Sequence, residues 1–147
     1  MSCDAAASLA FFWLAATGPV SPTASHAAPP PAVAQEPLFV DIVHRAKALK
    51  RQTDALRASD RPVPDAFKTA IGELSDLDMQ GHLTLAKRGT DGDLKCILRG
   101  ISQDLPLKLA ALTAAPDRKA RDGALKEMAY LLNDNVEVIT APPAPPV

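Results

Sequence analysis

The chain has 147 residues, a formal net charge of −1 and 47 % apolar residues, of which only a few are aromatic. This length accommodates one domain, and the charge balance excludes a strongly basic surface for nucleic acid or anionic lipid. Alanine and leucine dominate the apolar residues, and strand-forming residues never gather into an alternating run. The composition therefore favours an all-α protein.

An uncharged apolar run over residues 5–16 has the length of a signal-peptide core. It is shorter than the roughly 20 residues of a spanning helix, so we disfavour an uncleaved anchor and expect no stable membrane span after cleavage. Residues 32–34 (Ala-Val-Ala) have the form that signal peptidase accepts, and cleavage after Ala27 is the alternative. The absence of Lys and Arg before the run departs from the signal pattern, and a misassigned start codon would explain it. We predict a cleaved signal over 1–34 and a periplasmic or secreted protein.

The first two predicted helices are defined by apolar residues at helical spacing and by proline. The first helix should span about 38–58, and a connection with two prolines follows it. The second should begin at Pro64-Asp65, since proline fits a first helical turn, and should end at Arg88 with Gly89 as its cap. The inward stripes are expected to be Ile42, Ala46, Leu49, Thr53 and Leu56, and then Phe67, Ala70, Ile71, Leu74 and Leu77.

The third and fourth predicted helices contain one proline and one asparagine at informative positions. Thr90 or Asp91 should cap the third helix. Pro106 has no N–H for the carbonyl four residues earlier, so the Ser102 carbonyl should be left free. Asn135 is either buried with a hydrogen-bond partner or solvated at a frayed helix end. The inward stripes are expected to be Leu94, Ile97, Leu98, Ile101, Leu105, Leu109 and Leu112, and then Ala120, Ala124, Leu125, Met128, Leu131, Leu132 and Val138.

Four helices of about 20 residues with short connections predict an antiparallel up-down four-helix bundle. Prolines are concentrated on both sides of these helices, over 19–37 and 142–146. We therefore divide the chain into a signal segment over 1–34, the bundle over 35–140 and a proline-rich, disordered tail over 141–147.

The up-down topology brings several metal-ligating residue types to one end of the bundle. Asp41 precedes His44 by three positions, and Asp78 precedes His82 by four, so each pair shares a helix face. Together with Cys96, these residues are candidate ligands of a transition metal such as Cu or Zn. Helical phase opposes a shared internal site, because His44 and Cys96 point away from the apolar stripes. The alternative is that they are ordinary surface residues.

Cys96 would be the single cysteine after cleavage of residues 1–34. It would then be a free thiol, a redox-responsive intermolecular Cys96–Cys96 bridge, or a half-buried small apolar residue. The sequence alone leaves these three readings open.

Signatures of catalysis and of haem binding are missing from the chain. It contains no Gly-rich phosphate loop, Gly-x-Ser-x-Gly or His-Glu-x-x-His, no Cys-x-x-Cys-His, and no His in the fourth helix. We therefore expect no haem or other cofactor and a non-enzymatic interaction or adaptor module of the cell envelope. Its partner would be an unknown protein or a second copy in a homodimer, bound near the outward Leu107 and Tyr130. The alternatives are a metal-binding or metal-sensing bundle and a redox-responsive protein.

Overall fold

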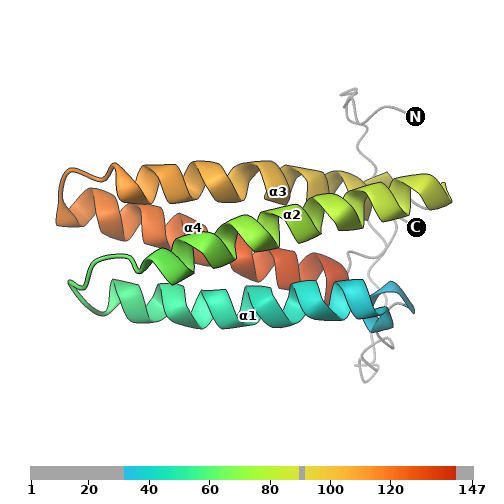
Figure 1. Ribbon diagram of the computed structural model, residues 1–147, viewed down its shortest axis with the longest axis horizontal. Helices are drawn as coiled ribbons and strands as arrows, with labels where there is room; N and C mark the ends of the chain where they lie inside the picture. Colours follow the sequence, from blue (N-terminus) through green and yellow to red (C-terminus); the bar gives the residue numbers. More distant parts are fainter. Residues whose placement is uncertain (1–31, 90–91, 142–147) are drawn as a thin grey trace, which may run out of the picture.

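The computed structural model describes residues 32–89 and 92–141, and it is all-helical over these ranges. A short 3-10 helix, η1 (Ala32–Gln35), precedes four α-helices: α1 (Pro37–Arg57), α2 (Asp65–Arg88), α3 (Gly92–Thr113) and α4 (Arg118–Thr140). Successive α-helices run in opposite directions, and each packs on two others (Figure 1). The predicted antiparallel four-helix bundle is confirmed. The predicted signal run and almost all of the tail lie outside the described residues.

Local sequence signals place the helix ends close to where they were predicted. Gly89 ends α2 in the left-handed conformation, with φ of 66°. Asp117 caps α4 by accepting a hydrogen bond from the backbone N–H of Ala120 at 2.8 Å. The predicted caps of α3, Thr90 and Asp91, lie outside the described residues.

Residues just before the predicted start of the bundle at residue 35 also pack against it. Val33 and Ala34, in η1, are half-buried and pack against the core. Arg88 at the end of α2 binds both carboxylate oxygens of Glu36 at 2.7 Å, and this guanidinium lowers the pKa of Glu36. Residues 32–36 are therefore part of this end of the bundle, because their burial and ion pairing link η1 to the helices.

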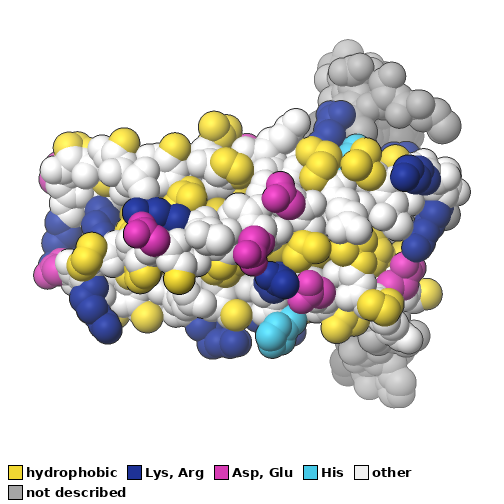
Figure 2. All heavy atoms as spheres, in the orientation of Figure 1, with side chains coloured by type: hydrophobic (Ala, Val, Ile, Leu, Met, Phe, Trp, Pro, Cys, Tyr) yellow, Lys and Arg dark blue, Asp and Glu magenta, His cyan; other side chains and the backbone are white. Residues whose placement is uncertain are grey.

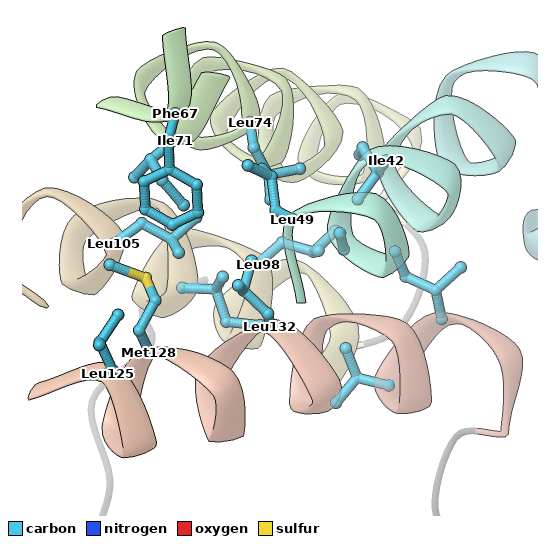
Figure 3. Close-up of a cluster of buried hydrophobic side chains, with 14 of the residues drawn as sticks. Ile42, Leu49, Phe67, Ile71, Leu74, Leu98, Leu105, Leu125, Met128 and Leu132 are labelled. Atoms are coloured by element: carbon cyan, nitrogen blue, oxygen red, sulfur yellow. The ribbon is translucent and has the colours of Figure 1, made fainter. Parts of the chain in front are cut away.

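One continuous apolar core runs along the bundle, and side chains from all four helices contribute to it (Figure 3). The predicted stripes of α1 and α3 face this core, although Leu94, Ile97 and Leu109 are only half-buried. Ala120 was predicted to face inward and is exposed, and in this first turn of α4 the neighbouring Arg121 is half-buried and contacts the end of α1. The buried residues of α2 are Phe67, Ile71, Leu74, Asp78, Gly81 and Leu85.

Arg121 joins the start of α4 to the end of α1. Its Nη1 donates to the carbonyl oxygens of Leu56 at 3.3 Å and Ser59 at 3.0 Å, and its Nη2 donates to that of Arg61 at 2.7 Å. The last carbonyls of a helix lack partners within the helix. A side chain from α4 therefore satisfies the C-terminal end of α1 and positions the connection to α2.

Gly81 marks a close approach of α2 to both α1 and α3. A Cβ atom at this position would lie 3.2 Å from Leu98 Cδ1, 3.3 Å from Phe39 Cε1 and 3.4 Å from Ile42 Cδ1. These distances are tight for carbon atoms, so a larger side chain at this position would displace three core residues.

Substitution of Gly81 and substitution of the other helical glycines are expected to have opposite effects on the free energy of unfolding. A Cβ atom at Gly72, Gly100 or Gly123 would meet nothing within 4 Å. Alanine at each of these three positions should raise the free energy of unfolding by about 0.5–1 kcal/mol, since glycine is the weaker helix former. Gly81→Val should lower it by about 1–3 kcal/mol. Urea denaturation of the four single variants measures both effects, and a Gly81→Val protein of wild-type stability would contradict the close approach.

Candidate functional site

A polar pair lies inside the apolar core. Asp78 on α2 and Asn135 on α4 are both 0 % exposed, and Asn135 Nδ2 donates to Asp78 Oδ2 at 2.8 Å. Within the described ranges, α2 and α4 make no backbone contact with each other, because each packs on α1 and α3 instead. The pair therefore crosses the centre of the bundle between two diagonal helices. Of the two alternatives left open for Asn135, the structure shows the buried side chain with a hydrogen-bond partner.

Burial changes the protonation of this site. It raises the pKa of Asp78 to about 8, and the hydrogen bond from Asn135 acts in the opposite direction with a smaller effect. Asp78 Oδ1 and Asn135 Oδ1 are buried as well, and neither has a hydrogen-bond partner. At pH 7 the carboxyl is mostly neutral. Neither side chain is exposed, so the polar pair is a buried element of the core.

A second polar contact joins α2 to α3 next to Pro106. The carbonyl of Ser102, which proline leaves without its usual donor, accepts a hydrogen bond from Ser75 Oγ at 2.6 Å. The hydroxyl of Ser102 donates to the Arg99 carbonyl at 2.8 Å. The helix α3 continues through Pro106 without a break. Ser75 was not identified from the sequence, because nothing local to it indicates which carbonyl faces it.

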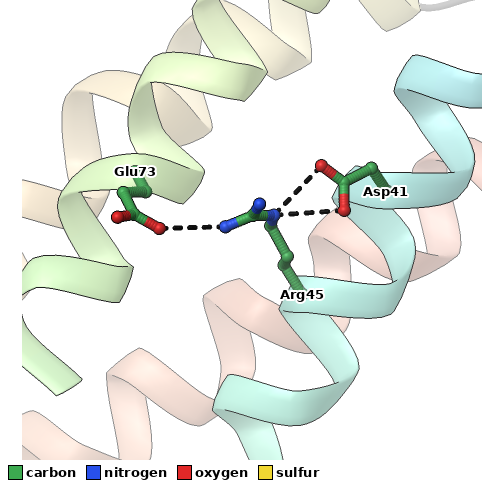
Figure 4. A network of polar contacts seen from close by, with 3 residues as sticks. All are labelled: Asp41, Arg45 and Glu73. Atoms are coloured by element: carbon green, nitrogen blue, oxygen red, sulfur yellow. Dashed lines mark hydrogen bonds and ion pairs between the residues drawn. The ribbon is translucent and has the colours of Figure 1, made fainter. Parts of the chain in front are cut away.

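Asp41, a candidate metal ligand, is engaged in an ion-pair network (Figure 4). Arg45 Nε lies 3.1 and 3.0 Å from the two carboxylate oxygens of Asp41, and Arg45 Nη1 lies 2.9 Å from Glu73 Oε2. The partner of Asp41 is therefore Arg45 one turn later and not His44, which is exposed on α1. These side chains are about half exposed, so solvent screens both ion pairs and they contribute little to stability.

The other candidate ligands also have separate surroundings. His82 Nδ1 donates to the carbonyl oxygen of Lys95 at 2.6 Å, and Asp78 binds Asn135 instead of His82. Cys96 is half-buried on α3 and is not a free thiol. Within residues 32–89 and 92–141, no three His, Cys, Asp or Glu side chains are grouped so that they could hold a metal ion. The geometry therefore gives the metal alternative no support.

The two large hydrophobic residues that are most exposed in the described part of the chain lie on α3 and α4. Tyr130 is 74 % exposed and Leu107 is 64 % exposed, as their helical phase predicted, while Leu83 on α2 is 51 % exposed. Apolar side chains are visible along the α3 edge of the molecule (Figure 2). A shallow hollow of about 530 Å³, here named the α3–α4 groove, lies beside Tyr130 and is lined by Asp104, Lys108, Gly123, Lys126, Glu127, Tyr130 and Leu131.

A smaller hollow of about 300 Å³ lies at the connection between α1 and α2, where Pro62, Pro64 and Phe67 line it. Over the described residues, the helices are too short or too polar for any of them to cross a membrane. Comparison of the chain with protein-family models, with curated proteins and with solved structures finds no match.

Proposed function

We propose that this protein is an exported, non-enzymatic helical module of the cell envelope that binds a protein partner through the face formed by α3 and α4. The observation that carries the proposal is the exposure of Tyr130, which lines the α3–α4 groove, together with that of Leu107 on α3. Tyrosine is enriched in protein interfaces and in their energetic centres. A large aromatic side chain that is three-quarters exposed gains most of its favourable burial only when a partner covers it.

The composition of α3 supports this choice of face. Over residues 106–115, Lys108 is the only charged side chain. Exposed apolar residues occupy the outer positions of this segment, namely Pro106, Leu107, Ala110, Ala111 and Ala114. A helix face with small apolar residues and few charges allows the close approach of another helix.

The charges around the α3–α4 groove favour a second copy of the chain as the first partner to test. Asp104 and Glu127 balance Lys108 and Lys126, and Lys108 Nζ binds Glu127 Oε2 at 2.6 Å. Because the groove residues have no net charge, two copies of this face do not repel each other. In a two-fold dimer the same patch occurs on both subunits, so acidic and basic groups can pair across the interface.

Substitution of Tyr130 tests the proposal, with Leu83 as the matched control. Tyr130→Glu should weaken self-association by about 30-fold or more, because a hot-spot residue contributes about 2 kcal/mol. Leu83→Glu, at an exposed hydrophobic position on α2, should leave the association unchanged. Sedimentation over a range of protein concentrations measures both. Photocrosslinking from position 130 in cells would reveal a different protein as the partner.

Two outcomes would overturn this function. A chain that is monomeric at every concentration, and that forms no adduct from position 130 in cells, does not use the proposed face. An intact mass that retains residues 1–34 would contradict export. Cleavage after Ala27 would keep η1 whole, whereas cleavage after Ala34 would remove the packing of Val33.

A further inference from the structure

Two buried oxygen atoms in the core lack a hydrogen-bond donor. They are Asp78 Oδ1 and Asn135 Oδ1, and neither has a hydrogen-bond partner. Each oxygen shares its Cγ atom with a partner of an existing hydrogen bond: Asn135 Nδ2 donates to Asp78 Oδ2 at 2.8 Å. An ionised carboxylate and an amide oxygen are both acceptors only. The two oxygens can therefore satisfy each other only if a hydrogen atom lies between them.

We propose that Asp78 carries a proton on Oδ1 in the native bundle and donates it to Asn135 Oδ1, so that acid and amide form a ring of two hydrogen bonds across the bundle centre. In this ring all four polar atoms of the pair are satisfied. Loss of the proton would leave a charge with a single hydrogen bond in an apolar core. The bundle is therefore more stable to unfolding when the ring is protonated than when it is not.

Among the described residues, no charge acts on Asp78 in place of the proton. Gly81, one turn from Asp78, is surrounded by Leu98, Phe39 and Ile42. The titratable and charged residues at this level of the four helices are all half-buried or exposed: Asp41, His44 and Arg45 on α1, Asp76 and His82 on α2, Lys95 and Arg99 on α3, and Asp134 on α4.

Three of these residues, Asp41, Arg45 and His82, have other partners. Arg45 binds Asp41 and Glu73, and His82 binds the Lys95 carbonyl. Burial is accordingly the main cause of the raised pKa of Asp78, and no ion pair contributes to it.

The proton makes stability depend on pH with a definite sign. The pKa of Asp78 rises from 3.8 to about 8 on folding, so the native state binds more protons than the unfolded state between these values. The stability that the protonated Asp78 contributes is fully present below pH 4 and is lost as the pH rises to about 8. Through this window the equilibrium constant of unfolding should rise by roughly tenfold per pH unit.

Asp78→Asn in the full chain tests the ring, because the second amide supplies the missing hydrogen without a titrating group. The variant should lack the pH dependence that Asp78 causes, and at pH 7 its equilibrium constant of unfolding should be on the order of 10³-fold lower than that of the wild type. Asp76→Asn, at an exposed carboxyl of the same helix, is the matched control and should behave like the wild type. Urea denaturation between pH 5 and pH 9 gives these values.

A direct measurement on the unsubstituted protein decides the case even if Asp78→Asn fails to fold. The ¹³C NMR signal of the Asp78 carboxyl should titrate with a midpoint near the pKa of about 8. A midpoint below pH 5 would show an ionised carboxylate in the native core and would overturn the proposal. An Asp78→Asn protein that is less stable than the wild type at pH 7, with the same pH dependence, would overturn it as well.

Discussion

Replacement of Asn135 by leucine is expected to lower the free energy of unfolding at pH 7 by about 3 kcal/mol, because it leaves a polar group buried without a partner. Asn135 makes the only side-chain hydrogen bond of Asp78 among the described residues, and both side chains are 0 % exposed. The carboxyl of Asp78 would remain in the apolar core, since α1 and α3, the two helices on which α2 packs, are unchanged. Urea denaturation of the single variant at pH 7 measures the loss.

A double variant separates this effect from a change in packing. Adding Asp78→Ala to Asn135→Leu removes both polar groups and keeps the combined size of the two side chains similar. An apolar replacement of a buried polar pair is often nearly neutral, so the double variant should regain most of the lost stability. A double variant as unstable as Asn135→Leu alone would show that misfit, and not the orphaned carboxyl, causes the loss.

Replacement of Ser75 by alanine is expected to lower the free energy of unfolding by about 1–3 kcal/mol, the cost of leaving a buried acceptor unsatisfied. Ser75 Oγ donates to the Ser102 carbonyl at 2.6 Å, and Pro106 has no N–H to take its place. The hydrogen bond connects α2 to α3 at the position where α3 lacks its own bond. Thermal or urea denaturation gives the size of the effect.

The same variant in a Pro106→Ala background provides the control. Alanine at 106 restores an N–H for the Ser102 carbonyl, so Pro106→Ala should itself raise stability, by up to about 3 kcal/mol. Ser75→Ala should then cost less than about 1 kcal/mol, which corresponds to a coupling of at least about 1 kcal/mol between the two sites. Strict additivity would contradict the role of Ser75 as the substitute donor.

The sequence by itself determined the number of helices, their approximate ends and the residues that most of them bury. These properties depend on short-range physics, because apolar spacing of three and four positions defines a helix face and single residues define the ends. Gly89 acts as the cap of α2 as predicted. The free carbonyl of Ser102 also followed from the sequence, because the missing N–H of Pro106 is a covalent property of proline.

Asp78 could have been recognised as a core residue from its spacing. It lies four positions after Leu74 and three before Gly81, within the seam that α2 buries. Its charge and its position four residues before His82 instead favoured an interpretation as a candidate metal ligand or as a surface partner of His82. The raised pKa of a buried carboxyl follows from the position on the helix and the absence of a nearby cation.

Only the tertiary structure decided which distant residues meet. It paired Asp78 with Asn135, gave the Ser102 carbonyl to Ser75, and placed Arg121 against the end of α1. Each of these contacts depends on the rotation and axial shift of one helix relative to another. A displacement of about 1 Å is enough to break a hydrogen bond. The apolar stripes that drive the packing do not fix the rotation and the axial shift so closely.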